Sequence, residues 1–112
     1  MVDPKILEND IILAEIVRRL IQDFHPTRVF LFGSRARGDE KEGSDYDLLV
    51  VLENITGPAF RLAQMAHRHT LQGISVPVDI VMISESQFEA KKTVIGTLPE
   101  AAIHEGKELY AA

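Results

Sequence analysis

The residues of this sequence best suited to chemistry are two aspartates at the start of an expected strand. Asp45 and Asp47 flank Tyr46 and open the apolar run from Leu48 to Leu52. Because side chains alternate along a strand, both carboxylates point to the same face and lie close enough to share divalent cations. Carboxylates held this close repel each other. A pair of Mg²⁺ ions would relieve that repulsion and would also bind phosphate groups.

A third carboxylate, Asp79, interrupts the otherwise apolar run from Val76 to Ile83, which is typical of a buried strand. Desolvation of an unpaired carboxylate is costly, and no lysine or arginine lies within this run. We therefore expect Asp79 to have a partner or a metal. Each aspartate alone also fits a structural role: Asp45 as a turn residue before a strand, and Asp79 as a hydrogen-bonded buried carboxylate.

A glycine-serine pair precedes these aspartates in the chain. Gly33 and Ser34 follow the apolar run Val29–Phe32, and ten residues separate Ser34 from Asp45. We expect a tight turn into a short helix, whose free backbone amides can receive an anion, with glycine allowing close approach to a phosphate. Arg35 and Arg37 follow; each fits a phosphate contact or a solvated position. The combined pattern predicts a phosphate-binding turn that faces a metal site.

Together these motifs resemble a known group of enzymes. The segments that carry the resemblance are Leu31 to Gly38, Ser44 to Val50, Val78 to Val81, and the ending from Glu105 to Tyr110. They are similar to the nucleotidyltransferase superfamily of the DNA polymerase beta type. Within it, the likeness is to the minimal nucleotidyltransferases, which are short single-domain proteins. The ordered set of motifs at these spacings carries the resemblance, since a lone Gly-Ser or Asp-x-Asp is a weak signal.

The resemblance implies a reaction and a role for each motif. An acceptor hydroxyl would attack the α-phosphate of a nucleoside triphosphate, with ATP as the donor, and pyrophosphate would leave. Asp45 and Asp47 would hold both Mg²⁺ ions, and Asp79 would complete the ligands of the second and accept the proton of the acceptor. Ser34 and the amides near Gly33 would bind the β- and γ-phosphates.

Three functions are compatible with this resemblance. Small minimal nucleotidyltransferases often act as antitoxins that modify a tyrosine of a HEPN-type toxin with AMP. A transferase for a small molecule, as among the aminoglycoside-modifying relatives, is a second possibility, although those relatives carry an extra domain. The third is a nucleotide- or partner-binding module without turnover, which the complete set of three aspartates disfavours.

Composition indicates one small domain over residues 1–112. The chain has 46% hydrophobic residues and no cysteine, which excludes disulfides and zinc-thiolate sites and fits the cytoplasm. The sequence suggests neither a secretory signal nor a membrane span. The net charge of −5 and the pI near 5.3 argue against a nucleic-acid partner and favour a free nucleotide.

The remaining pattern alternates strands and helices. We expect an amphipathic helix over residues 6–24 that Pro26 ends, a strand over 28–32, a charged loop over 38–44 that is mobile until nucleotide binds, and further helices over 59–71, 87–92 and 98–104. His67 and His69 are expected on a solvated helix face, because residues two apart point to different sides. Tyr110 is expected to pack back onto the core.

These elements predict an α/β (α+β) sandwich, a mixed sheet with helices on one face and the three aspartates on the other. Leu49 and Val51 would share the face of Asp45 and Asp47, so the sheet beside the site would be apolar and need a cover. We therefore expect a second subunit, either an identical copy or a different protein, to complete the acceptor side.

Overall fold

The structure is a computed structural model that describes residues 4–41 and 44–112. The chain forms, in order, α1 (Pro4–Glu8), α2 (Ile11–Phe24), β1 (Arg28–Phe32), α3 (Gly33–Arg37), β2 (Tyr46–Leu52), α4 (Ala59–Met65), the π-helical turn η1 (Ala66–Thr70), β3 (Val78–Ser84), α5 (Glu85–Lys91), α6 (Leu98–Glu105) and β4 (Lys107–Ala111). No helix within the described ranges combines the length and hydropathy that a membrane crossing requires.

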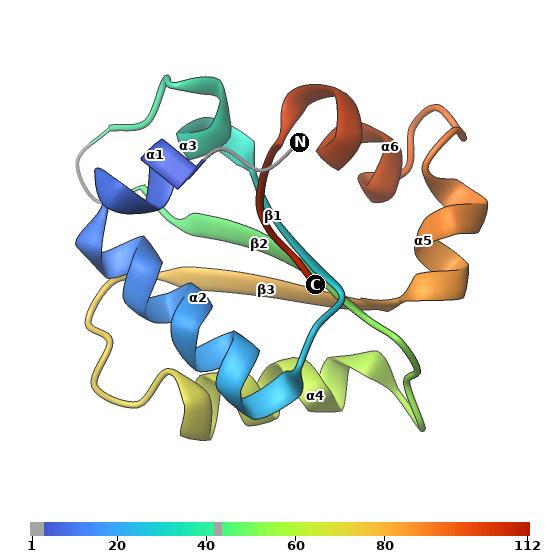
Figure 1. Cartoon of the computed structure of the whole chain (residues 1–112), viewed down its shortest axis with the longest axis horizontal. Helices are drawn as coiled ribbons and strands as arrows, with labels where there is room; N and C mark the ends of the chain where they lie inside the picture. Colours follow the sequence, from blue (N-terminus) through green and yellow to red (C-terminus); the bar gives the residue numbers. More distant parts are fainter. Residues whose placement is uncertain (1–3, 42–43) are drawn as a thin grey trace.

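The described strands form one mixed sheet in the order β3-β2-β1-β4 (Figure 1). β1 is antiparallel to both β2 and β4, whereas β2 and β3 are parallel. The parallel pair is joined by a crossover that contains α4 and η1, as a parallel connection requires. The predicted fold class, a mixed sheet with helices, is confirmed.

One face of the sheet carries the larger hydrophobic core. Successive strand residues alternate, so Leu48 and Val50 point to this face, where α2, α4 and η1 cover them. Ile16, Leu20 and Ala66 of these helices are fully buried, each with 0% exposure. This layer is the rigid support on which the opposite face of the sheet is held.

The predicted helix over residues 6–24 is wrong at its beginning, because the structure breaks it into α1 and α2. Asp10 lies at the break, and its Oδ1 accepts a hydrogen bond of 3.0 Å from the backbone amide of Leu13. That bond satisfies one of the free amides at the start of α2, which makes Asp10 an N-cap. α2 ends at Phe24, where His25 adopts a left-handed conformation with φ of 49° just before Pro26.

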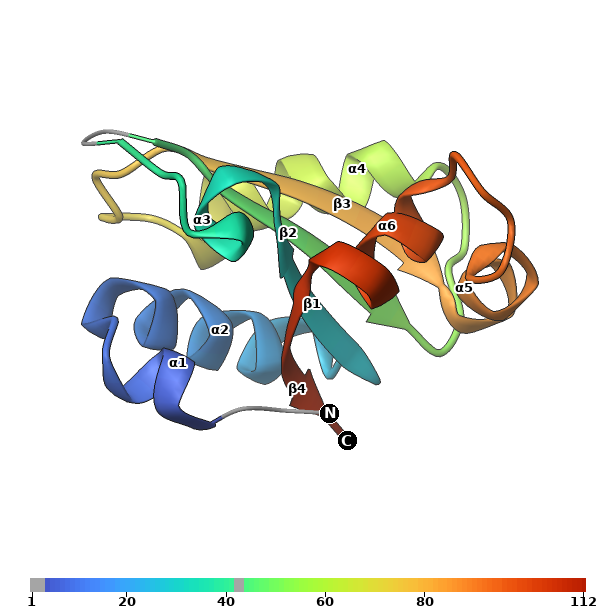
Figure 2. The same cartoon turned by 90° about the horizontal axis from the view of Figure 1, so that it is seen from above.

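The aspartate face is also partly covered, by helices of the chain itself. α5 and α6 lie on the side of the sheet opposite α1 and α2 (Figure 2). Their Phe88 and Ala102 bury Leu49 and Val51, both at 0% exposure. The expectation that a second subunit must cover these two residues is therefore wrong. The expected placement of all helices on one face fails for the same reason.

The final strand, β4, was not expected from the sequence. It pairs with β1 and buries Leu109, while Tyr110 packs against the main core as predicted. Gly106 lies between α6 and this strand at a crowded point, where a Cβ atom would lie 2.6 Å from the carbonyl oxygen of Ala102 and 2.8 Å from that of Leu31. Only glycine fits here without a shift of the backbone, so Gly106 allows the last helix to turn directly into the sheet.

Candidate active site

The turn after β1 lies against Asp47. Phe32, the last residue of β1, pairs with Asp47 of β2, and Gly33 follows with a φ of 75°. A Cβ atom on Gly33 would lie 2.2 Å from Oδ2 of Asp47 and 3.1 Å from its Cγ. Glycine is thus required both by the left-handed conformation and by the space that the carboxylate occupies. The turn and the carboxylate, which the sequence placed in two separate motifs, are in direct contact.

Strand register brings the aspartates together. Asp47 pairs with Asp79 across the parallel strands β2 and β3, and neighbouring strands lie about 4.8 Å apart. Asp45 comes immediately before β2. Tyr46 between them is buried on the opposite face at 3% exposure, so alternation puts Asp45 and Asp47 on one side. Asp45 and Asp79 are exposed and Asp47 is half-buried.

Asp47 is the carboxylate whose electrostatic surroundings are unfavourable to its charged form. Desolvation raises the pKa of Asp47, and the negative charges of Asp79 and Asp45 raise it further, while Arg37 acts in the opposite direction. Within the described part of the chain, none of the three side chains forms an ion pair or a side-chain hydrogen bond to relieve this repulsion. The site therefore concentrates negative charge that a cation would stabilise.

A divalent cation fits this donor set chemically. The available ligands are carboxylate oxygens, which suit Mg²⁺. Two of the three carboxylates, those of Asp45 and Asp79, are exposed to solvent. Among the described residues, however, no group of three or more His, Cys, Asp or Glu side chains already has a metal-binding arrangement. Ligation of Mg²⁺ by Asp45, Asp47 and Asp79 thus stays a prediction.

Arg35 is engaged with the chain rather than pointing freely to solvent. Its Nε and Nη2 donate to the carbonyl oxygen of Ser44 at 3.0 and 2.9 Å, and its guanidinium carbon lies 3.9 Å from the ring centroid of Tyr46. Ser44 and Tyr46 are the two neighbours of Asp45. Arg35 therefore contacts the backbone before that carboxylate and the side chain after it, and its predicted contact with phosphate stays a prediction.

Tyr46 connects the segment around Asp45 to α2 on the opposite face of the sheet. Its hydroxyl donates to Oδ2 of Asp10 at 2.8 Å, the same aspartate that caps α2. Burial, and then the hydrogen bond and charge of Asp10, raise the pKa of Tyr46 to about 12, so the phenol keeps its proton. The sequence analysis assigned no role to Tyr46 or to Asp10. The available signal for Tyr46 was its position as an aromatic residue that alternates with two aspartates, whereas no local pattern singled out Asp10.

The other predicted residues lie beside this centre. Arg37 pairs with Asp39 at 3.4 Å, and both side chains are exposed. The carbonyl oxygen of Ser34 accepts the amides of Gly38 and Asp39 and closes α3, while its hydroxyl makes no hydrogen bond to another described residue. The hydroxyl of Ser34 is therefore available to an anion, whereas Arg37 would have to exchange its exposed pair with Asp39 to reach one.

The arrangement of sheet, turn and carboxylates is that of a nucleotidyl-transferring domain. A sequence profile of the nucleotidyltransferase domain family matches residues 12–104, and the chain belongs to this family. A putative nucleotidyltransferase from Sulfolobus solfataricus is 32% identical, with 70% of this chain and 69% of that chain covered and a TM-score of 0.55. The predicted resemblance is confirmed.

Two further solved structures share the fold. One is a toxin-antitoxin with AMP-PNP, at 24% identity, with 88% of this chain and 73% of that chain covered and a TM-score of 0.59. The other is a mutant of the toxin-antitoxin MntA-HpeT, at 20% identity, with 89% and 72% covered and a TM-score of 0.59. A comparison with curated proteins finds no match.

Proposed function

We propose that this domain transfers AMP from ATP to the hydroxyl of a protein acceptor, a tyrosine of a HEPN-type toxin, and releases pyrophosphate. The observation that carries the proposal is the strand register, in which Asp47 pairs with Asp79 and with Phe32, the residue before Gly33, at one end of the three strands. Membership of the nucleotidyltransferase family supports nucleotidyl transfer. The likeness in fold to a toxin-antitoxin with AMP-PNP supports the choice of nucleotide and acceptor.

Each residue of the site would then have a defined task. Asp45, Asp47 and Asp79 would hold Mg²⁺, which when bound neutralises triphosphate charge and lowers the pKa of the acceptor hydroxyl. The hydroxyl of Ser34 would donate to the β- and γ-phosphates of ATP, and Arg37 would add a positive charge beside them. Asp79 lies exposed on the edge strand β3, so it can receive the proton of an acceptor that approaches from solvent.

Ligand-dependent thermal unfolding tests the nucleotide site. The wild type and Asp47→Asn would be unfolded with each nucleoside triphosphate, with and without Mg²⁺. ATP at about a hundred times its dissociation constant should stabilise the wild type by roughly 2.7 kcal/mol, or roughly 10 °C. The Asp47→Asn variant should show no such shift. An equal shift without Mg²⁺, or in the variant, contradicts the predicted metal ligands.

A second experiment tests the acceptor. The chain would be incubated with ATP, Mg²⁺ and a purified HEPN-type toxin, and the toxin would be analysed by intact-mass spectrometry and peptide mapping. The proposal expects an added AMP on a tyrosine with wild-type chain and none with Asp47→Asn. An unmodified toxin, in a sample whose chain shows the ATP-dependent stabilisation, would reject the protein acceptor while leaving nucleotide binding intact.

A further inference from the structure

A second surface with a distinct chemical character lies on the helix layer across the sheet from the aspartates. From Asn54 to Val78 the sequence has no Asp or Glu, although the chain has 17 acidic residues and a net charge of −5. This segment contains α4 and η1, and its arginines are Arg61 and Arg68. Neither arginine forms an ion pair with a described residue. The segment is thus a local basic surface on an acidic domain.

A groove of about 450 Å³ runs along this surface. Two neighbouring rows of side chains line it, and successive residues within a row are four positions apart. One row is Phe60, Gln64 and Arg68, and the other is Arg61, Met65 and His69. Phe60 is 61% exposed and Met65 is 49% exposed, which is high for side chains of this size. No carboxylate lines the groove.

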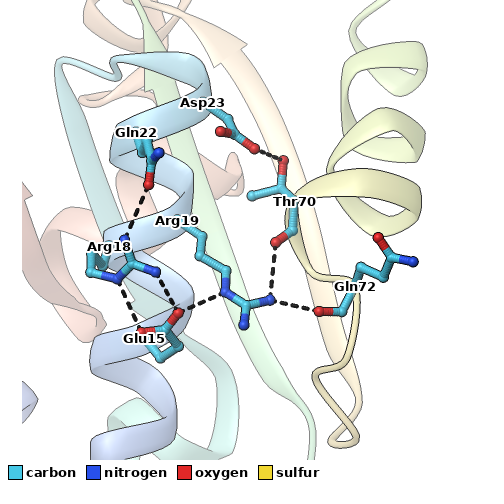
Figure 3. Close-up of polar contacts among 7 residues, drawn as sticks. All are labelled: Glu15, Arg18, Arg19, Gln22, Asp23, Thr70 and Gln72. Atoms are coloured by element: carbon cyan, nitrogen blue, oxygen red, sulfur yellow. Dashed lines mark hydrogen bonds and ion pairs between the residues drawn. The ribbon is translucent and has the colours of Figure 1, made fainter.

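The opposite side of η1 is fixed to α2. Arg19 donates to the carbonyl oxygens of Thr70 and Gln72 at 3.3 and 2.7 Å, and the hydroxyl of Thr70 donates to Asp23 at 2.8 Å (Figure 3). Ala66 at the start of the turn is fully buried. Because the inner side is anchored, the groove is presented on a preformed support, and binding there would not require the turn to order.

We propose that this α4–η1 groove binds a partner protein through a segment that carries carboxylates beside an apolar side chain. Aromatic residues, Met and Arg are the types enriched at protein interfaces, and an acidic segment would complement the unpaired Arg61 and Arg68. Two arginines are too few to neutralise the phosphates of a nucleic acid against the net charge of the chain. The groove is remote from the aspartate face, so the interaction is independent of the proposed reaction and leaves the site open.

Amide NMR with a defined probe tests this proposal. The probe is a synthetic amphipathic helix with Leu at i and i+4 flanked by Glu, and its control has Gln at every Glu. Resonances of residues 60–69 of the full chain should shift with the acidic peptide, less at high salt, and not with the Gln peptide. Arg68→Glu, and separately Phe60→Ser, should weaken binding by about tenfold or more. Lys91→Glu, an equal charge change at an exposed position of α5, should not.

The thermal midpoint of each variant would be measured first, since all three positions are exposed and the fold should persist. Three outcomes overturn the proposal. Stronger shifts of the groove with heparin or a short RNA would assign it to a polyanion. Shifts on concentration alone, with a dimer in sedimentation, would assign it to a second copy of the chain. No shift with any of these probes would make the groove an ordinary solvated surface.

Discussion

The substitution Gly33→Ala should change both the stability of the fold and the response of the domain to ATP and Mg²⁺. These two effects can be measured separately. Gly33 has a φ of 75°, and a left-handed conformation costs a residue with a Cβ atom about 1–2 kcal/mol. The new methyl group would also lie 2.2 Å from Oδ2 and 3.1 Å from Cγ of Asp47, so the carboxylate as a whole must move. We expect a loss of about 1–3 kcal/mol, or roughly 4–12 °C, together with the loss of Mg²⁺-dependent stabilisation by ATP.

Gly57→Ala is the matched control. Gly57 has a φ of 79°, nearly the same backbone conformation, but no atom lies within 4 Å of a Cβ built on it. This variant should lose about 1–2 kcal/mol from backbone strain alone and keep the full response to ATP and Mg²⁺. Differential scanning calorimetry, with and without ligand, measures both quantities. If Gly33→Ala kept the ATP response of the wild type, the contact between turn and carboxylate would have no functional role.

Substitutions at three other positions test the same site. Asp47→Asn should be more stable than wild type at neutral pH without metal, because the raised pKa of Asp47 makes its ionised form destabilising; the gap should narrow as the pH falls through this raised pKa and vanish below the ordinary 3.8, and a constant gap would contradict this. Arg35→Ala should weaken Mn²⁺ binding in an EPR titration, with partial rescue in Arg35→Lys; normal Mn²⁺ affinity with weak ATP binding would instead make Arg35 a phosphate ligand. Tyr46→Phe should lose about 1.5 kcal/mol through its bond to Asp10. That stabilisation should be absent from the wild type once the pH exceeds about 12, as a denaturation series against pH would show.

Much of the fold was predictable because local pattern and tertiary structure agree. The strand over residues 28–32 was predicted with the bounds that β1 has in the structure. The period of two along a strand also puts Asp45 and Asp47 on one face from local sequence alone. The pairing of Asp47 with Asp79 depends on a parallel register between distant strands, so the sequence could suggest it only through the family resemblance.

The failures have physical causes. The helical spacing of apolar residues continues on both sides of Asn9 and Asp10, so the sequence does not reveal the break between α1 and α2. The structure reveals it through the capping hydrogen bond of Asp10. The cover over Leu49 and Val51 comes from Phe88 and Ala102, which lie far along the chain. The π-helical turn η1 contains only one apolar residue, Ala66, so the apolar pattern could not distinguish it from the α-helix before it. An arginine is a residue type that commonly binds phosphate, so the sequence predicts that role for Arg35. Its hydrogen bonds to Ser44 can be seen only in the structure.

The position of β3 at the border of the sheet has a consequence for solubility. Its outer backbone groups have no neighbouring strand among the described residues, and its sequence, VDIVMIS, is rich in β-branched residues with Asp79 as its one charge. Exposed strands of this composition pair readily with strands of other molecules, and an isolated charge opposes such pairing. Asp79 therefore protects the protein from aggregation, whatever it does in the reaction. Asp79→Ala should precipitate on heating sooner than the wild type, so Asp45 and Asp47 are the better positions at which to test the predicted metal site by substitution.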